Sequence, residues 1–167
     1  MNDWYVLHVK TGREHDTKAV LNRDLPGVVS LVPERILRER INGKWKEVSR
    51  NLLPGYVFIN AFMETDLYYK LTAIPSVIRI LGSGKPDPVP LDEMQVILRL
   101  SNDGDPLGLS EIYHIGNKIC VASGPLAGME GQIVKVDARR FRAKVNISLM
   151  GEPRIVELGI VDISKVD

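Results

Sequence analysis

Residues 116–133, GNKICVASGPLAGMEGQI, are the stretch whose glycine content comes nearest to a phosphate-binding loop. Gly124, Gly128 and Gly131 can adopt a positive φ without steric cost, and Pro125 fixes φ near a value typical of turns. A nucleotide-binding loop of this kind ends in Gly-Lys-Ser or Gly-Lys-Thr and continues as a helix. This stretch has no such ending, and it continues as an apolar strand. The glycines therefore indicate a tight turn between two strands.

Other residue types that carry catalysis are isolated along the chain. His8, His15 and His114 do not have the spacing of metal ligands, and Cys120 has no obvious base partner. The cysteine is better explained as a packed residue of a sheet. We therefore predict that the protein is not an enzyme, with no catalytic residue, no cofactor and no metal site.

Two clusters of basic residues could bind a phosphate backbone. The first is Arg139-Arg140-Phe141-Arg142-Ala143-Lys144, in which strand alternation places Arg140, Arg142 and Lys144 on one face and turns Phe141 to the core. Guanidinium groups offer forked donors to phosphates. The second is a predicted hairpin over 35–50 with Trp45 near its tip, which could also lie beside upstream DNA. The hairpin can equally be solvated surface, because charged edges prevent sheets from aggregating. The barrel cluster has the alternative of a solubilising surface, over which binding is favoured.

The overall composition limits the class of protein. The chain has 167 residues, with 22 basic and 21 acidic side chains, so any basic surface must be local. A single cysteine excludes an internal disulfide framework and suits a reducing compartment. The first residues lack an export leader, and no apolar run is long enough to span a bilayer. We expect a cytoplasmic protein without a membrane partner.

The first hundred residues predict a β-α-β-β-α-β order with an added helix. Thr11 and Glu14 have the spacing of a capping box at the start of the first helix, and Asn42-Gly43 is typical of a hairpin turn. The polar, glycine-rich segment that follows predicts a linker. Five short strands are expected after it, at 117–123, 131–137, 141–149, 153–158 and 160–164. Short strands at this spacing suit a closed barrel. The expected domains are 1–102, a linker over 103–114, and 115–167.

Three motifs in this order resemble the NusG family of bacterial transcription elongation factors. They are Trp4-Tyr5, the segment Leu53-Pro54-Gly55-Tyr56-Val57, and residues 116–133, which are similar to the KOW motif of small barrels that work beside RNA. The resemblance covers almost the whole chain. It implies an α+β fold, with an N-terminal split β-α-β antiparallel sheet with helices (NGN-like) and a C-terminal five-stranded SH3-like KOW β-barrel.

A narrower resemblance is to the LoaP-like specialised paralogues of NusG, which are processive antiterminators. It is carried by residues 9–14, 128–131, 139–144 and 149–151. It implies antitermination in long operons and recognition of a structured element in the nascent leader RNA. The candidate RNA-binding residues are then Arg139, Arg140, Arg142, Lys144, Arg38, Arg40, Lys44 and Lys46.

The family resemblance also implies that the N-terminal domain binds the clamp of RNA polymerase through an exposed apolar patch. The candidate RNA polymerase-binding residues are Tyr5, Pro54, Tyr56, Phe58, Ile80 and Thr65. The residue pattern alone favours the core for the apolar members, and the family resemblance reverses this for Tyr5 and Tyr56. The expected partners are RNA polymerase, nascent structured RNA and upstream DNA, and the protein is expected to be a monomer. The alternative is a general NusG-like elongation factor whose barrel binds a ribosomal or termination-factor surface.

Overall fold

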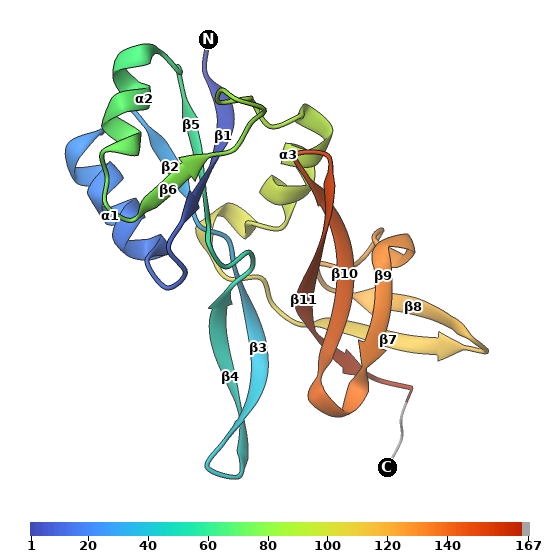
Figure 1. The fold of residues 1–167 in the computed structure, drawn as a ribbon. Coiled ribbons are helices and arrows are strands. Elements are labelled where there is room, and N and C mark those ends of the chain that lie inside the picture. The colour runs from blue at the N-terminus through green and yellow to red at the C-terminus, as the bar shows by residue number, and fades with distance from the viewer. Residues whose placement is uncertain (165–167) are drawn as a thin grey trace. The chain divides into compact units, whose positions relative to one another are not determined.

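The computed structural model describes residues 1–164, and the chain divides into two compact units. Unit 1 contains Met1–Val32, Leu53–Arg99 and Leu149–Gly151. Unit 2 contains Pro33–Leu52, Leu100–Ser148 and the residues from Glu152 onward. Each unit is built on its own sheet (Figure 1). No helix in the described part of the chain is long and apolar enough to cross a membrane.

Unit 1 is a four-stranded antiparallel sheet with helices on both sides. The strand order is β2-β5-β1-β6. The strands are β1 (Asp3–Val9), β2 (Val29–Leu31), β5 (Tyr56–Ala61) and β6 (Val77–Ile80), and the helices are α1 (Glu14–Asp24), α2 (Thr65–Thr72) and α3 (Leu91–Arg99). In Figure 1, α1 and α2 lie on one side of the sheet and α3 lies on the other.

The sheet of unit 1 is buried on both faces because helices cover both. Leu7 of β1 shares a core with Leu21 of α1 and Leu71 of α2. On the opposite face Val6 lies directly across from Phe58, and both side chains are fully buried. A strand with two buried faces has few polar positions, which explains the nearly continuous apolar sequence of β1 and β5.

The start of α1 differs from the predicted capping box. The helix has Arg13 at its N-cap position, and no side chain caps it. The Glu14 carboxylate is buried and accepts a hydrogen bond of 3.0 Å from the backbone N–H of Gly55. Glu14 therefore fixes the turn that contains Pro54 and Gly55, where Gly55 has a φ of 90°. The capping-box prediction is wrong because the helix begins at Glu14 with Arg13 at its N-cap position, so Thr11 lies two residues before the cap.

Unit 2 combines a two-stranded hairpin with a five-stranded barrel-like sheet. The sheet order is β8-β7-β11-β10-β9. The hairpin strands are β3 (Glu34–Ile41) and β4 (Lys44–Asn51), and the sheet strands are β7 (Ser110–Ile115), β8 (Lys118–Ser123), β9 (Ile133–Asp137), β10 (Arg142–Leu149) and β11 (Glu152–Asp162). Short 3-10 helices are η1 (Asn102–Gly104), η2 (Glu130–Gln132) and η3 (Ala138–Arg140). The predicted α+β class is confirmed.

Two features of unit 2 differ from the sequence expectations. Part of the expected linker, 103–114, is strand β7, which pairs in parallel with β11 and antiparallel with β8. The two strands expected over 153–158 and 160–164 are the single strand β11. Gly159 lies within β11. Because glycine has no side chain, the β11 backbone can pass close to Ile36 of β3 and to Leu109. The hairpin belongs to the same compact unit as the barrel. The predicted domain boundaries stay a prediction. Of the expected last domain, residues 165–167 lie outside the described part of the chain.

Candidate nucleic-acid interface

The register of the β3–β4 hairpin sorts its basic residues onto two faces. Arg40 lies opposite Trp45, and Arg38 lies opposite Glu47, so these side chains share one face. The two lysines, Lys44 and Lys46, lie on the other face. The predicted two-residue turn is present at Asn42 and Gly43, both with positive φ. The hairpin therefore presents one face with Arg38, Arg40 and Trp45. The opposite face holds the two lysines together with Arg35, Glu39 and Arg50.

Phe141 leaves the barrel core and meets the hairpin. The residue follows η3, and its backbone has a φ of 57°. Its ring contacts the Trp45 ring edge to face, with 5.0 Å between centroids, and the Arg38 guanidinium lies 4.8 Å above it. The prediction that Phe141 faces the core is wrong, because η3 breaks the strand alternation before β10 begins. Ala143 and Val145 do face the core, as predicted.

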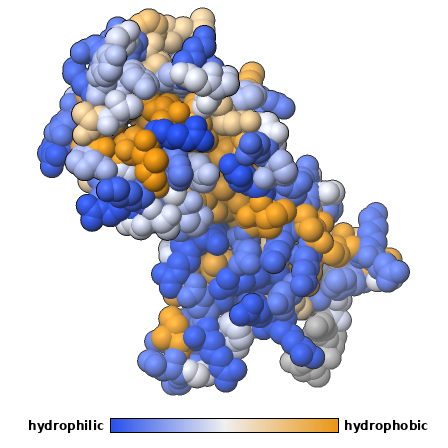
Figure 2. All heavy atoms as spheres, viewed as in Figure 1, coloured by the Kyte–Doolittle hydropathy of each residue, from blue (hydrophilic) through white to orange (hydrophobic). Residues whose placement is uncertain are grey.

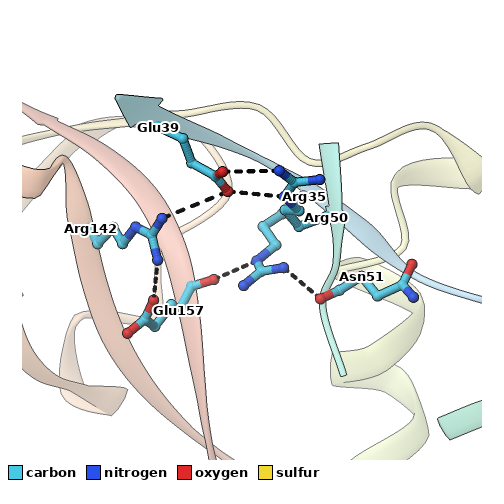
Figure 3. A network of polar contacts seen from close by, with 6 residues as sticks. All are labelled: Arg35, Glu39, Arg50, Asn51, Arg142 and Glu157. Atoms are coloured by element: carbon cyan, nitrogen blue, oxygen red, sulfur yellow. Dashed lines mark hydrogen bonds and ion pairs between the residues drawn. The ribbon is translucent and has the colours of Figure 1, made fainter. Parts of the chain in front are cut away.

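An ion-pair network joins the hairpin to β10 and β11 (Figure 3). The Arg142 guanidinium donates to Glu157 at 2.8 Å and lies 3.8 Å from Glu39. Arg50 donates to both oxygens of Glu39 at 2.9 Å. Arg35 donates to the backbone carbonyls of Glu157 and Asn51. These contacts fix the position of the hairpin within unit 2.

The charges of this network have shifted pKa values with clear causes. The hydrogen bonds from Arg50 lower the pKa of the Glu39 carboxyl, and the same pair raises the pKa of Arg50. Burial lowers the pKa of Arg35, and the nearby Arg142 charge adds to that effect. An arginine remains protonated at neutral pH after a moderate decrease of its pKa. Glu39, Arg35 and Arg50 are therefore charged near neutral pH.

The hairpin and the barrel together form a pocket of about 420 Å³. It is lined by Arg38, Glu39, Arg40, Trp45, Arg140 and Arg142. Four arginines surround one glutamate, and the glutamate is already bonded to Arg50. Figure 2 shows that hydrophilic residues cover most of the hairpin and the five-stranded sheet in this view. The pocket is therefore suited to an anionic ligand with a flat apolar part.

The structure brings together half of the candidate RNA-binding residues. Arg38 and Arg40 from the hairpin meet Arg140 and Arg142 from the barrel. Arg139 and Lys144 are exposed but do not line the pocket, like Lys44 and Lys46 on the far face of the hairpin. Sequence reasoning does not include Trp45 and Phe141 in the set, although Trp45 is visible as an aromatic residue inside a basic hairpin.

The candidate polymerase-binding residues of unit 1 divide into buried and accessible sets. The expectation that Tyr5, Phe58 and Ile80 are exposed is wrong, because the helices cover both faces of the sheet. Burial also raises the pKa of Tyr5. The accessible residues are Pro54 and Thr65, which are exposed, and Tyr56, which is half-buried.

Tyr56 has a partner that the sequence did not indicate. Its ring stacks on the ring of His8, its cross-strand neighbour, with 5.4 Å between centroids. On the other side of His8 lies Arg79 of β6, which is exposed. A surface contact of this sheet face would therefore use Tyr56 together with His8 and Arg79.

Metal binding gains no support from the geometry. Within the described residues, no group of three or more histidine, cysteine, aspartate or glutamate side chains could hold a metal ion. The chemistry that the arrangement offers is recognition through arginines, aromatic rings and apolar surface.

Comparison with known proteins shows the family of this chain. The sequence model of a family described as "Transcription termination factor nusG" matches residues 2–98. The chain belongs to the NusG family. A NusG relative from Haemophilus influenzae, described as a transcription termination/antitermination protein, is 30% identical over 98% of this chain and 94% of its own length. The corresponding protein of Halalkalibacterium halodurans is 29% identical, covering 98% of each chain.

A solved NusG structure has the same fold. The structure described as "Domain interaction in Thermotoga maritima NusG" covers 95% of this chain and 94% of its own length, with a TM-score of 0.59 and 25% identity. Membership of the NusG family makes this protein a transcription factor of the termination/antitermination class.

Proposed function

We propose that this NusG-family protein is an antitermination factor of the LoaP-like type that binds RNA polymerase through unit 1 and a structured leader RNA through unit 2. The observation that carries the proposal is the convergence of hairpin and barrel arginines on one pocket beside Trp45. Arginine is the residue best suited to phosphate recognition. Two contacts on one protein would raise the effective concentration of the second partner once the first is bound.

The unit 1 contact that we propose uses the accessible members of the candidate set. Tyr56, Pro54 and Thr65 reach the surface, and Tyr56 is an aromatic anchor held by its stack on His8. Aromatic residues bury a large area for a small loss of side-chain entropy, which suits docking on a helical partner such as a polymerase coiled coil. We also propose that the protein acts in the cytoplasm as a monomer, with upstream DNA as a further ligand of the hairpin.

The RNA part of the proposal is tested by a charge-matched pair of variants. Arg40→Ala/Arg140→Ala removes two pocket arginines and leaves the Arg142 ion pairs in place. Lys118→Ala/Lys135→Ala removes the same charge from exposed positions of β8 and β9 outside the pocket. We expect gel-shift affinity for leader RNA to fall at least tenfold in the first variant and less than threefold in the second, because each lost charge-assisted contact weakens binding by roughly 1–2 kcal/mol. Equal losses would contradict the proposal.

The polymerase part is tested separately by Tyr56→Ala. We expect this variant to lose RNA polymerase in a pull-down and to lose terminator read-through in a transcription reaction, while its RNA affinity stays unchanged. Arg40→Ala/Arg140→Ala should retain polymerase in the same pull-down. Retention of polymerase by Tyr56→Ala would contradict the unit 1 contact.

The alternative, a general elongation factor with a protein-binding barrel, is favoured by a different observation. Val134 of β9 and Ile155 of β11 are apolar and more than half exposed on unit 2. Under this alternative, Val134→Ser/Ile155→Ser would abolish binding of a ribosomal or termination-factor protein in a pull-down, whereas loss of the pocket arginines would not change that binding.

A further inference from the structure

We propose that the pocket of unit 2 binds one unpaired nucleotide of the RNA, with its base stacked on Trp45 and its phosphate held by Arg40 and Arg140. This inference rests on the proposed RNA binding and specifies which chemical feature of the RNA is recognised. A folded leader RNA offers such nucleotides in loops and bulges, where bases are free to leave the stack.

Trp45 is the aromatic residue that lines the pocket, and Phe141 packs against its ring. Trp45 keeps 43% of its surface exposed although it contacts the Phe141 ring. Phe141 in turn lies beneath the Arg38 guanidinium, which fixes it from the side of the hairpin. A large aromatic residue that is held in place and still exposed, among arginines, is the arrangement on which nucleic-acid bases stack.

The backbone at Phe141 supports a binding role for this region. Its φ of 57° lies in the left-handed region, which bulky residues rarely adopt because the side chain crowds the backbone. The turn is held by Asp137, whose carboxylate accepts from the Arg140 N–H at 3.3 Å. Strained backbone of this kind concentrates at binding sites. Here the strain brings Phe141 against Trp45 and places Arg140 at the pocket.

Two of the four pocket arginines are not ion-paired within the described part of the protein and are therefore available to a ligand. Arg142 is bonded to Glu157, and the Glu39 carboxylate is bonded to Arg50. Among the residues that the structure describes, Arg40 and Arg140 make no ion pair, and both are exposed. Two guanidinium groups beside an aromatic ring match the phosphate and the base of one nucleotide. The volume, about 420 Å³, is in the range of small-ligand pockets.

Fluorescence of Trp45 tests the stacking directly. The chain has two tryptophans, Trp4 and Trp45, so full-length protein carrying Trp4→Phe reports on Trp45 alone. The probes are a single-stranded RNA of about 10 nucleotides, within the size range of single-strand sites, and a blunt RNA duplex of the same length. We expect the single strand to quench Trp45 fluorescence and to bind at least tenfold more tightly than the duplex, because a paired base is not available for stacking.

Substitution of Trp45 separates stacking from charge. Trp45→Ala should weaken single-strand binding by about 5- to 150-fold, the range for loss of one stacked base. Trp45→Phe should recover most of the affinity, and Lys118→Ala, at an exposed position of β8 outside the pocket, should change it less than threefold. Circular dichroism and thermal unfolding establish that each variant is folded.

The outcomes distinguish this inference from the proposed function on which it rests. If the duplex and the single strand bind equally, without quenching and with no effect of Trp45→Ala, the nucleotide pocket is wrong and charge-based RNA binding remains. If neither of these two RNAs binds, the nucleotide pocket is wrong, and the gel shift with leader RNA decides the proposed RNA binding on its own. Quenching of Trp45 by a glutamate-rich peptide with greater affinity than by the single strand would overturn the inference in favour of an acidic protein ligand.

Discussion

At Gly159 the packing of unit 2 requires the absence of a side chain. A Cβ at this position would lie 2.5 Å from the backbone oxygen of Ile36 and 2.3 Å from a methyl carbon of Leu109. The leucine side chain can move, but the Ile36 oxygen belongs to strand β3 and cannot move alone. We therefore expect Gly159→Ala to lower the free energy of unfolding by about 1–3 kcal/mol, as overpacking does elsewhere.

Urea unfolding monitored by circular dichroism measures this loss. Gly108→Ala is the matched control in the same unit, because a Cβ at Gly108 would have no neighbour within 4 Å. That control should change the free energy of unfolding by less than about 1 kcal/mol, the typical range for glycine-to-alanine substitutions without strain. Equal effects of the two substitutions would mean that the close approach of β11 to β3 is not needed for stability.

Glu39 gives the stability of unit 2 a pH dependence. Hydrogen bonds from Arg50 lower its pKa below the ordinary value of 4.5, so the folded state favours the charged carboxylate. This contribution is fully present above about pH 4.5 and is lost as the pH falls through the lower folded value. In urea titrations, wild-type protein should exceed Glu39→Gln in stability at pH 7, and the difference should shrink between pH 5 and about pH 3. A difference that is constant with pH would exclude Glu39 as the titrating group.

The elements follow from local patterns, whereas their packing depends on long-range contacts. Asn42-Gly43 predicts the hairpin because few other pairs adopt the required positive φ. No local signal shows that Arg35, a charged residue on a strand, is buried and bonded to Glu157, which is 122 positions away. The core prediction for Phe141 fails for a related reason. Strand alternation is a local rule, and it stops applying where η3 interrupts the strand.

In the candidate site, too, local sequence patterns predict the type of residue, whereas long-range packing decides which residues come together. The arginines are recognisable as a class from their density, and four of the eight candidate basic residues line the pocket. Which four they are depends on the hairpin register and on the docking of the hairpin against β10, and neither can be read from spacing. The exposure predicted for Tyr5 and Phe58 is wrong because a sequence does not show that helices cover both faces of the sheet. Tyr5 shares a core with Leu21 of α1, and Phe58 is buried on the opposite face.

Arg142 should mainly hold the hairpin against the barrel, and contribute less as a contact to the ligand. It bonds Glu157 and approaches Glu39, so it connects β10 and β11 with β3. Arg142→Gln should lower the free energy of unfolding by roughly 1–2 kcal/mol, a value reduced by its partial exposure. It should also increase amide hydrogen exchange across β3 and β4. Arg140→Gln, which leaves the network intact, should not change the exchange, and faster exchange in that variant would contradict this division of roles.

At the scale of the whole molecule, the charge is nearly balanced, with a formal net charge of +1. Attraction to a polyanion must then come from the local arrangement in unit 2 and not from a general positive field. Binding to RNA should therefore depend on salt only as strongly as the few pocket arginines allow. Each neutralised phosphate of a single strand contributes about 0.7 to the slope of log affinity against log salt concentration.

Four pocket arginines set an upper slope of about 3, and the two that make no ion pair set a lower slope of about 1.4. Arg40→Ala/Arg140→Ala should reduce the slope by about 1.4, because it removes both of the arginines that we assign to phosphate. Lys118→Ala/Lys135→Ala changes the net charge equally and should leave the slope nearly unchanged. Fluorescence anisotropy with a labelled single-stranded RNA between about 50 and 200 mM salt measures it. If both pairs reduced the slope equally, net charge would control RNA binding and the pocket would have no special part in it.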